Sequence, residues 1–256
     1  MPAGMHLERS WKGMEDMKIN PRYLSFYYQD MEDYQDMEID LKKTALCIID
    51  YQKEFCDDHM GEALEIKKNG QWERWQYFRN RIHNTAIPNT QKLLFWARKE
   101  GMTVTFGRIA CLSPDGEDRS PVQKREGWNN IFLYRGSEEA AMVDELKPLP
   151  EEMVFDKTTD SIMGSTSYAG VLRNMGITTV IVAGIVTDQC VACSVRDLAD
   201  AGFQVICVED ACAAASEEGH DAELKIMNVI YCRVCRTEET LELLEKAAAA
   251  GGPVTV

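Results

Sequence analysis

Basic residues, histidine and long apolar runs are scarce in this chain. Its 256 residues include 28 Lys or Arg against 42 Asp or Glu, which gives a net charge of −14. No basic cluster offsets this charge, so we expect neither nucleic acid nor a membrane surface as a partner. The four histidines, His6, His59, His83 and His220, are scattered without the spacing of metal ligands, and we therefore expect no metal site.

Membrane spans, signal peptides and linkers are absent from the sequence as well. No stretch has the length and hydrophobicity of a membrane-spanning helix, and none has the pattern of a secretory signal. No Pro-, Gly- or Ser-rich stretch divides the middle of the chain. The odd number of cysteines, nine, favours reduced thiols over a disulfide framework. We therefore expect a cytoplasmic protein with one main domain and a small-molecule partner.

Short apolar runs alternate with helical patterns along most of the chain. The runs typical of strands are 45–49, 103–106, 153–155, 179–183, 204–208 and 229–234. The helical patterns span 89–100, 137–146, 167–175, 189–201, 217–228 and 237–248. This alternation predicts a three-layer α/β/α fold around a doubly wound, six-stranded parallel sheet with the strand order 3-2-1-4-5-6.

The two ends of the chain differ in composition from this alternating region. Residues 1–43 are rich in Met and Tyr, and we expect an N-terminal arm that packs on a partner subunit. Residues 44–246 are predicted to form the domain itself. Residues 247–256 consist mostly of small side chains and are predicted to be a flexible tail.

The segment from Val180 to Cys190 places a thiol directly after a buried strand. Its first residues are mostly β-branched, which is typical of a parallel strand buried on both faces. Gly184 opens the turn, and Thr187 or Asp188 can cap the helix that follows. A thiol at the positive end of a helix dipole can have its pKa lowered from ~8.5 to between ~3.5 and ~7.5. Cys190 is therefore a candidate nucleophile.

Two further polar residues lie at the ends of predicted strands. Asp50 ends the first strand, and Lys157 follows the third. Because ligands of doubly wound sheets bind outside the carboxyl ends of the strands, we expect Asp50, Lys157 and Cys190 to meet there. A proton acceptor, a cation and a nucleophile together form the set of groups that acyl transfer requires.

Three segments around these residues, in this order, resemble the isochorismatase-like cysteine hydrolases. They run from Ile48 to Phe55, from Lys157 to Ser161, and from Gly184 to Val191. The family includes N-carbamoylsarcosine, ureidoacrylate and biuret amidohydrolases as well as nicotinamidases. The resemblance implies an enzyme that cleaves a C–N bond of a small amide or ureido (N-carbamoyl) compound through a thioester, releases ammonia and needs no cofactor.

The resemblance also assigns roles to residues. It implies that Asp50 is the general acid/base, that Lys157 is the cation that stabilises the charges, and that Cys190 is the nucleophile. A cis peptide between Ile185 and Val186 is implied, with the N–H groups of Val186 and Cys190 forming the oxyanion hole. A homodimer or homotetramer is the usual assembly in this family.

One departure from the family pattern separates this chain from the nicotinamidases. Those enzymes carry a metal-binding Asp-x-His after the second strand, whereas residues 108–119 contain no histidine here. The resemblance therefore favours the metal-independent branch. Arg135 is a further candidate for binding a substrate carboxylate. Other candidates for substrate contact, from their position alone, are Gln52, Phe55, Trp72, Arg108, Met163 and Thr187.

Four other interpretations remain open at this stage. Hydrolysis of an isochorismate-type vinyl ether uses the Asp and the Lys and needs no cysteine. A Cys190-x-x-Cys193 pair fits a thiol–disulfide oxidoreductase. Those two cysteines together with Cys232 and Cys235 form a weak zinc pattern, because the latter two fall on opposite faces of a predicted strand. A binding role without catalysis is the fourth.

Overall fold

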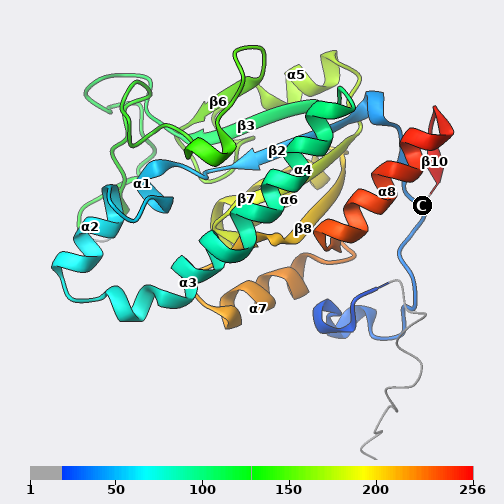
Figure 1. Ribbon diagram of the computed structural model, residues 1–256, viewed down its shortest axis with the longest axis horizontal. Helices are drawn as coiled ribbons and strands as arrows, with labels where there is room; N and C mark the ends of the chain where they lie inside the picture. The colour runs from blue at the N-terminus through cyan, green and yellow to red at the C-terminus, as the bar shows by residue number, and fades with distance from the viewer. Residues whose placement is uncertain (1–18, 128, 256) are drawn as a thin grey trace, which may run out of the picture.

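The computed structural model of the chain describes residues 19–127 and 129–255, and a single parallel sheet lies at its centre (Figure 1). The sheet contains six strands, in the spatial order β6 (Met153–Lys157), β3 (Thr103–Ile109), β2 (Thr44–Ile49), β7 (Thr179–Ile185), β8 (Gln204–Ala213) and β9 (Arg233–Cys235). Counted along the chain, this order is 3-2-1-4-5-6. The predicted topology is therefore confirmed.

Helices cover both faces of the sheet and so complete the three predicted layers. One face carries α4 (Ile87–Lys99) and α8 (Thr237–Ala250). The other face carries α5 (Tyr168–Asn174), α6 (Ala192–Asp200) and α7 (Glu217–Met227). Three further helices, α1 (Lys53–Cys56), α2 (Gly61–Lys68) and α3 (Gln76–Arg81), follow β2. None of the described helices is long and apolar enough to cross a membrane.

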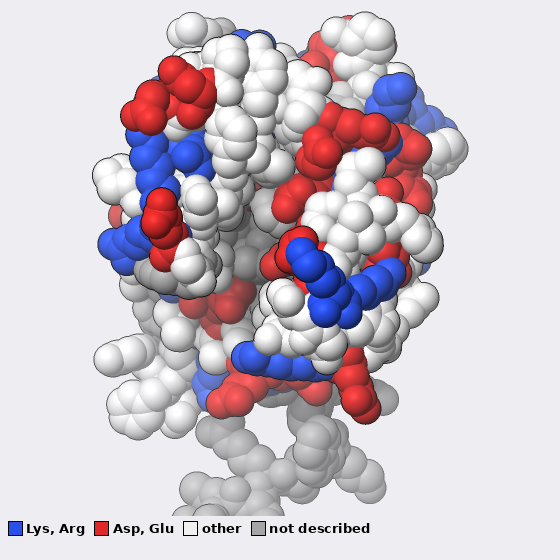
Figure 2. Space-filling model, turned by 90° about the vertical axis from the view of Figure 1, so that its left-hand side faces the viewer, with Lys and Arg blue, Asp and Glu red and all other residues white. Residues whose placement is uncertain are grey.

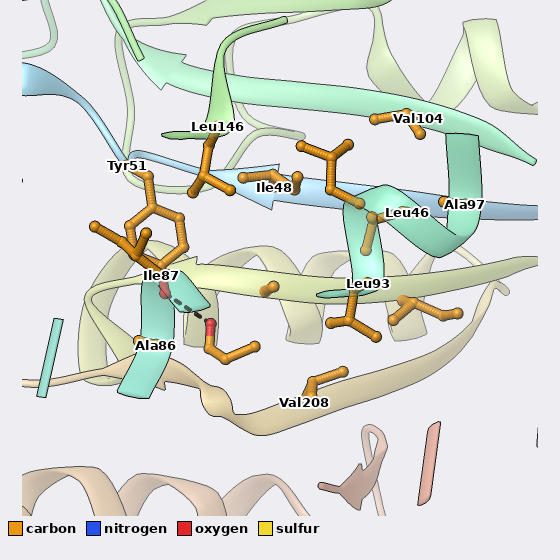
Figure 3. Close-up of a cluster of buried hydrophobic side chains, with 14 of the residues drawn as sticks. Leu46, Ile48, Tyr51, Ala86, Ile87, Leu93, Ala97, Val104, Leu146 and Val208 are labelled. Carbon is orange, nitrogen blue, oxygen red and sulfur yellow. Dashed lines mark hydrogen bonds between the residues drawn. The ribbon is translucent and has the colours of Figure 1, made fainter. Parts of the chain in front are cut away.

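Neighbouring side chains of each central strand point to opposite faces of the sheet. In β2, Leu46 and Ile48 pack on the face of α4 and α8, whereas Cys47 and Ile49 pack on the face of α5, α6 and α7. Figure 3 shows part of the first cluster, where Leu93 of α4 lies over the strands. Burial on both faces explains why the sequence of β2 is continuously apolar.

The strands at the centre of the sheet end side by side. In the parallel register, Ile49 at the end of β2 lies opposite Gly107 of β3 and Gly184 of β7. Ile109 at the end of β3 lies opposite Lys157 of β6. The carboxyl ends of these four strands therefore share one edge, which lies on the left in Figure 1.

One predicted helix is wrong. Residues 137–146 form turns that end in a 3-10 helix, Asp144–Leu146. The Ala141 carbonyl accepts a hydrogen bond from the Lys53 N–H at 2.8 Å, so it is engaged with the segment after β2. Tertiary pairing has overridden a local helical pattern in this stretch.

The sixth strand begins later than predicted. The apolar run 229–234 suggested a strand, but β9 starts only at Arg233. Val229 adopts a φ of 77° in a turn, where its N–H donates to the Cys232 carbonyl at 2.9 Å. Because a residue with left-handed backbone angles cannot continue a regular strand, the strand begins only after this turn.

Both ends of the described chain pack on the domain itself. Arg22 of the arm pairs with two acidic side chains of α7. The strand β1 (Glu38–Ile39) pairs antiparallel with β10 (Val254–Thr255). Within 247–255, the chain completes α8 through Ala250 and supplies β10, and the flexibility of this tail stays a prediction. Residues 1–18 of the predicted arm lie outside the described residues, and contact of the arm with a partner subunit stays a prediction.

The close approach of β7 to β2 yields a stability prediction at Gly184. A Cβ atom at this residue, whose φ is 155°, would lie 2.4 Å from the Ile49 carbonyl oxygen. We expect Gly184→Ala to lower the free energy of unfolding by about 1–3 kcal/mol, the usual range for overpacking.

Gly170 provides the matched control, because a Cβ atom there meets nothing within 4 Å. Gly170→Ala in α5 should raise the stability by up to about 1 kcal/mol, since Ala is the better helix former. Urea unfolding of both variants measures the difference. Equal stability of the two would contradict the described packing of β7 on β2.

Candidate active site

Asp50 follows β2 directly, and the backbone turns sharply there. Its φ of 55° lies in the left-handed region, which Asp tolerates better than most residues. The Asp50 N–H donates to the Gly107 carbonyl at 2.9 Å, and Oδ1 accepts from the Ile109 N–H at 2.9 Å. The end of β3 thus fixes the carboxylate with Oδ2 next to Lys157.

Lys157 ends β6 and brings an ammonium group into the same buried space. Its side chain is completely buried. Its Nζ lies 2.8 Å from Asp50 Oδ2, 3.4 Å from Cys190 Sγ and 3.3 Å from the Thr159 carbonyl oxygen. The structure therefore brings the three candidate residues together around one ammonium group.

The turn that carries Cys190 differs from the predicted α-helical turn. Thr187–Val191 form a π-helical turn, η8, and α6 begins only after it. Val186 occupies the N-cap position, so the expected caps, Thr187 and Asp188, do not act as caps. Cys190 itself is 5% exposed, which leaves the thiol only narrow access to solvent.

The entry to this turn is irregular. The peptide bond between Ile185 and Val186 is cis, as the resemblance implies. The Val186 carbonyl accepts hydrogen bonds from the N–H groups of Gln189 at 3.1 Å and Val191 at 3.3 Å. The N–H of Cys190, which lies between these two residues in the chain, makes no hydrogen bond to that carbonyl.

Burial shifts the pKa values of all three groups. It raises the pKa of the Cys190 thiol well above the ordinary value; the Lys157 ammonium opposes this shift and the Asp50 carboxylate adds to it. Burial also raises the pKa of Asp50, again against the effect of Lys157. Burial alone would lower the pKa of Lys157, but the neighbouring Asp50 and Cys190 raise it overall.

These directions indicate the resting state of the site. A buried ammonium is stable only beside a counter-charge, so Lys157 and Asp50 form an ion pair. The Cys190 thiol keeps its proton at neutral pH. Desolvation in this buried turn thus acts on the thiol pKa against the lowering effect of the helix dipole.

Two predicted substrate contacts support the backbone or another side chain instead. The buried Gln52 donates to the Ile109 carbonyl at 2.8 Å and accepts from the Ile109 N–H at 2.8 Å. Arg108 Nε lies 2.6 Å from Asp156 Oδ1. Since Arg108 and its neighbour Ile109 alternate along β3, Arg108 points away from the face on which Ile109 packs with Cys190.

Three other predicted contacts fall in different places. Phe55 and Met163 are partly buried against the large apolar cluster that also contains Cys190. Trp72 lies in the segment between α2 and α3, with the Nζ of Lys67 4.3 Å from its ring centroid. Its ring is also 5.6 Å from the guanidinium carbon of Arg79 in α3, so Trp72 contacts the two flanking helices.

Sequence analysis missed the positions of His220 and Arg81, which lie behind the nucleophile turn. Thr187, predicted to contact substrate, has its Oγ1 2.8 Å from His220 Nδ1. The other ring nitrogen of His220 lies 2.7 Å from an Arg81 nitrogen. His220 shares the buried stripe of α7 with Leu224 and Met227, and a histidine on an apolar stripe was the signal available in the sequence.

The zinc pattern is not realised. Cys232 and Cys235 pack in separate clusters on opposite faces of the sheet, as predicted. Four thiolates from the two Cys-x-x-Cys pairs therefore cannot surround one ion. Within residues 19–127 and 129–255, no group of three or more His, Cys, Asp or Glu side chains is arranged to hold a metal ion.

The surface at this edge of the sheet is hollowed and carries charged side chains of both signs. Figure 2 views the molecule from the side at which the strands end, and Asp and Glu side chains border a central hollow. A hollow of about 320 Å³ lies beside α1 and is lined by residues that include Lys53, His83 and Glu145. None of the three candidate residues lines it.

The charges beside Cys190 predict that two substitutions affect alkylation of the thiol differently. Lys157→Met removes the cation that lowers the Cys190 pKa, so alkylation of Cys190 by iodoacetamide should slow at a fixed pH. Asp50→Asn removes a charge that raises this pKa, and alkylation should not slow. In the wild type the rate should climb from about pH 7 to about pH 10, because a thiol with a raised pKa ionises late.

Mass spectrometry of the Cys190 peptide measures these rates, and the exposed Cys193 serves as the internal reference. A rate that reaches its plateau below pH 7, or equal slowing in both variants, would contradict the assigned charges.

Comparison with known proteins identifies the family. Residues 44–239 match the model of the isochorismatase domain. An uncharacterized isochorismatase family protein of Bacillus subtilis is 28% identical over 210 residues, which cover 82% of this chain and 97% of the relative. A ureidoacrylate amidohydrolase of Pseudomonas savastanoi is 36% identical over 168 residues, which cover 60% of this chain and 64% of the relative.

A solved structure gives the same answer for the fold. The isochorismatase family protein of Desulfovibrio vulgaris superimposes with a TM-score of 0.65 at 24% identity, over 79% of this chain and 98% of that one. The match of residues 44–239 to the family model covers the whole six-stranded sheet and the edge at which its strands end. The chain belongs to the isochorismatase family of hydrolases.

Proposed function

We propose that this protein is a cysteine-dependent amidohydrolase that cleaves a C–N bond of a small amide or ureido compound and releases ammonia. The observation that carries the proposal is the buried contact of Lys157 Nζ with Asp50 at 2.8 Å and with Cys190 at 3.4 Å. Similarity to a ureidoacrylate amidohydrolase supports this substrate class. Vinyl ether hydrolysis would leave the thiol without a role, and disulfide exchange would leave the ion pair without one.

The first half of the reaction forms a thioester. Asp50 accepts the thiol proton of Cys190, and the sulfur attacks the carbonyl carbon of the substrate. The N–H groups of Val186 and Cys190 stabilise the oxyanion that forms on the carbonyl oxygen. Asp50 then donates the proton to the leaving nitrogen, the C–N bond breaks, and ammonia departs.

The second half regenerates the enzyme. Asp50 accepts a proton from a water molecule, whose oxygen attacks the thioester carbonyl. The C–S bond breaks, the sulfur regains a proton from Asp50, and the acid product leaves. The raised pKa of Asp50 suits this double role, since a base whose pKa lies closer to neutral exchanges protons more readily in both directions.

Lys157 stabilises negative charge throughout both halves. Its ammonium faces the carboxylate at rest and the sulfur 3.4 Å away once the proton has moved. The charge therefore passes between two atoms that both contact one fixed cation. Such a preorganised arrangement needs little rearrangement when the reaction occurs.

Arg108 and Arg135, both considered for a substrate carboxylate, share one counter-charge. Asp156 lies 2.6 Å from Arg108 Nε and 3.3 Å from Arg135 Nε, so the three side chains together carry one positive charge.

Ammonia release from a panel of small amides and ureido compounds tests the proposal directly. The wild type should release ammonia from a member of the panel, and Cys190→Ala should release none. Hydroxylamine should intercept the thioester as a hydroxamate. Prior dialysis against a chelator should leave the rate unchanged. Full activity in Cys190→Ala would refute a thiol mechanism.

A double-variant cycle tests whether Asp50 and Lys157 act as one unit. Asp50→Asn keeps the shape but cannot carry the proton, so kcat should fall by about 10²-fold or more. Lys157→Met should also lower kcat. Because both act on the same step, the double variant should lose far less than the product of the two single losses. Multiplicative losses would mean that the two residues act independently.

A further inference from the structure

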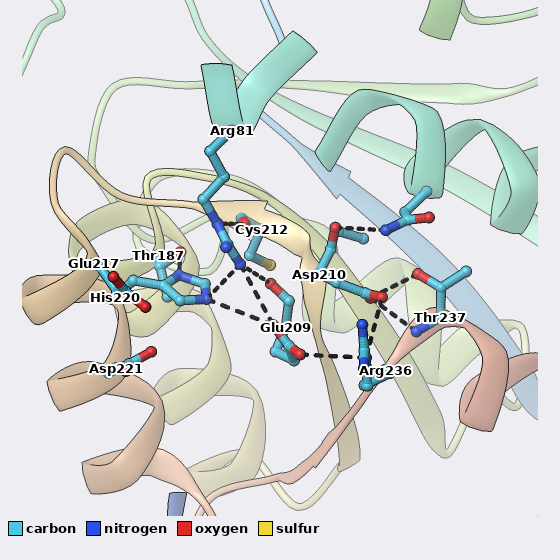
Figure 4. A network of polar contacts seen from close by, with 12 residues as sticks. Arg81, Thr187, Glu209, Asp210, Cys212, Glu217, His220, Asp221, Arg236 and Thr237 are labelled. Atoms are coloured by element: carbon cyan, nitrogen blue, oxygen red, sulfur yellow. Dashed lines mark hydrogen bonds and ion pairs between the residues drawn. The ribbon is translucent and has the colours of Figure 1, made fainter. Parts of the chain in front are cut away.

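His220 lies behind the nucleophile turn in a buried polar network (Figure 4). The residue is 1% exposed and belongs to α7, which packs against η8. Its Nδ1 lies 2.8 Å from Thr187 Oγ1, and its Nε2 lies 2.7 Å from Arg81. One imidazole ring therefore connects the first residue of the nucleophile turn to a cation of α3.

The partner of each ring nitrogen fixes the tautomer of His220. An arginine side chain has hydrogen-bond donors and no acceptor, so Nε2 must accept from Arg81. The proton of a neutral ring is then on Nδ1, which donates to Thr187 Oγ1. Burial lowers the pKa of His220, which agrees with a neutral ring at physiological pH.

Arg81 is itself held in place on the far side of the ring. Its Nε donates to the Cys212 carbonyl at 2.9 Å, and one of its terminal nitrogens donates to the Glu209 carbonyl at 2.9 Å. Both carbonyls belong to β8. The chain of contacts thus runs from a central strand through Arg81 and His220 to Thr187.

We infer that His220 is a positioning residue of the proposed amidohydrolase, which holds the turn between Val186 and Cys190 by donating a hydrogen bond to Thr187. Thr187 directly follows Val186 and lies three residues before Cys190, the two residues whose N–H groups form the proposed oxyanion hole. The inference rests on the proposed function for its catalytic consequence.

The physical reason is the sensitivity of an oxyanion hole to direction. The donors must point at the position that the oxyanion will occupy, and a displacement of about 1 Å can cost on the order of 10²-fold in rate. The N-cap residue of η8 makes no side-chain capping bond, so the Thr187 hydroxyl provides a side-chain anchor at the start of the turn. Without that anchor, the first residues of η8 gain freedom.

Two substitutions separate hydrogen bonding from packing. His220→Leu removes both hydrogen bonds, whereas His220→Gln keeps one donor and one acceptor about as far apart as the ring nitrogens. His83→Leu is the matched control, since His83 is an exposed histidine that pairs with Asp58. Melting temperatures establish which variants fold.

Three measurements test the inference: kcat and KM for the amide that the wild type hydrolyses, the alkylation rate of Cys190, and amide hydrogen exchange in peptides that cover Thr187–Val191. His220→Leu should lower kcat by about 10- to 100-fold with KM and alkylation within about two-fold, because alkylation forms no oxyanion. Exchange in the turn should accelerate. In His220→Gln, most of kcat and most of the protection from exchange should be restored. His83→Leu should resemble the wild type.

Each contrary outcome is distinct. Wild-type kcat and exchange in His220→Leu would overturn the inference, and so would equal impairment of the Leu and Gln variants, since only packing would then matter. If His220→Leu does not fold, Thr187→Val and Thr187→Ser repeat the test from the other end of the hydrogen bond, with loss expected only for Val. Should the wild type hydrolyse no amide, the proposed function fails, while hydrogen exchange still decides whether His220 holds the turn.

Discussion

The ion pair between Asp50 and Lys157 is the interaction on which the rest of the site depends. Both side chains are removed from water, and loss of one partner of a buried pair typically costs about 3–5 kcal/mol because the other charge stays uncompensated. Strands that end side by side bring the two groups together, and the N–H of Ile109 orients the carboxylate. The thiol of Cys190 is placed beside an existing charge pair and needs no ionisation of its own at rest.

Much of this arrangement could be predicted from the sequence, for a physical reason. Buried parallel strands need continuous apolar runs, and crossover connections permit few strand orders. Once the order was predicted, the polar residues that end strands had to meet at one edge, which located Asp50, Lys157 and Cys190 together. The strand order is confirmed, and Lys157 Nζ lies 2.8 Å from Asp50 Oδ2 and 3.4 Å from Cys190 Sγ.

The remaining features depend on contacts that no local pattern contains. Whether Gln52 faces substrate or the backbone of β3 is decided by the loop that packs over it. The helical pattern of 137–146 was overridden by pairing with the segment after β2. The state of the Cys190 thiol reflects a competition between burial and nearby charge, and the sequence gives no measure of burial. His220 could be noticed in the sequence as a histidine on an apolar stripe. Its two partners, Thr187 and Arg81, could not be predicted.

The pairing of β1 with β10 has a consequence for the chain as a whole. Glu38 of β1 also accepts a hydrogen bond from Thr179, the first residue of β7, so this small sheet lies at the amino edge, opposite the edge that carries Cys190. The part of the chain between β1 and β10 is therefore nearly a closed loop, and the junction of this loop is remote from the proposed active site. A short linker joining the two segments would add little loop-closure entropy, and new termini opened in the surface turn at Gly127 would give a circular permutant with the same sheet.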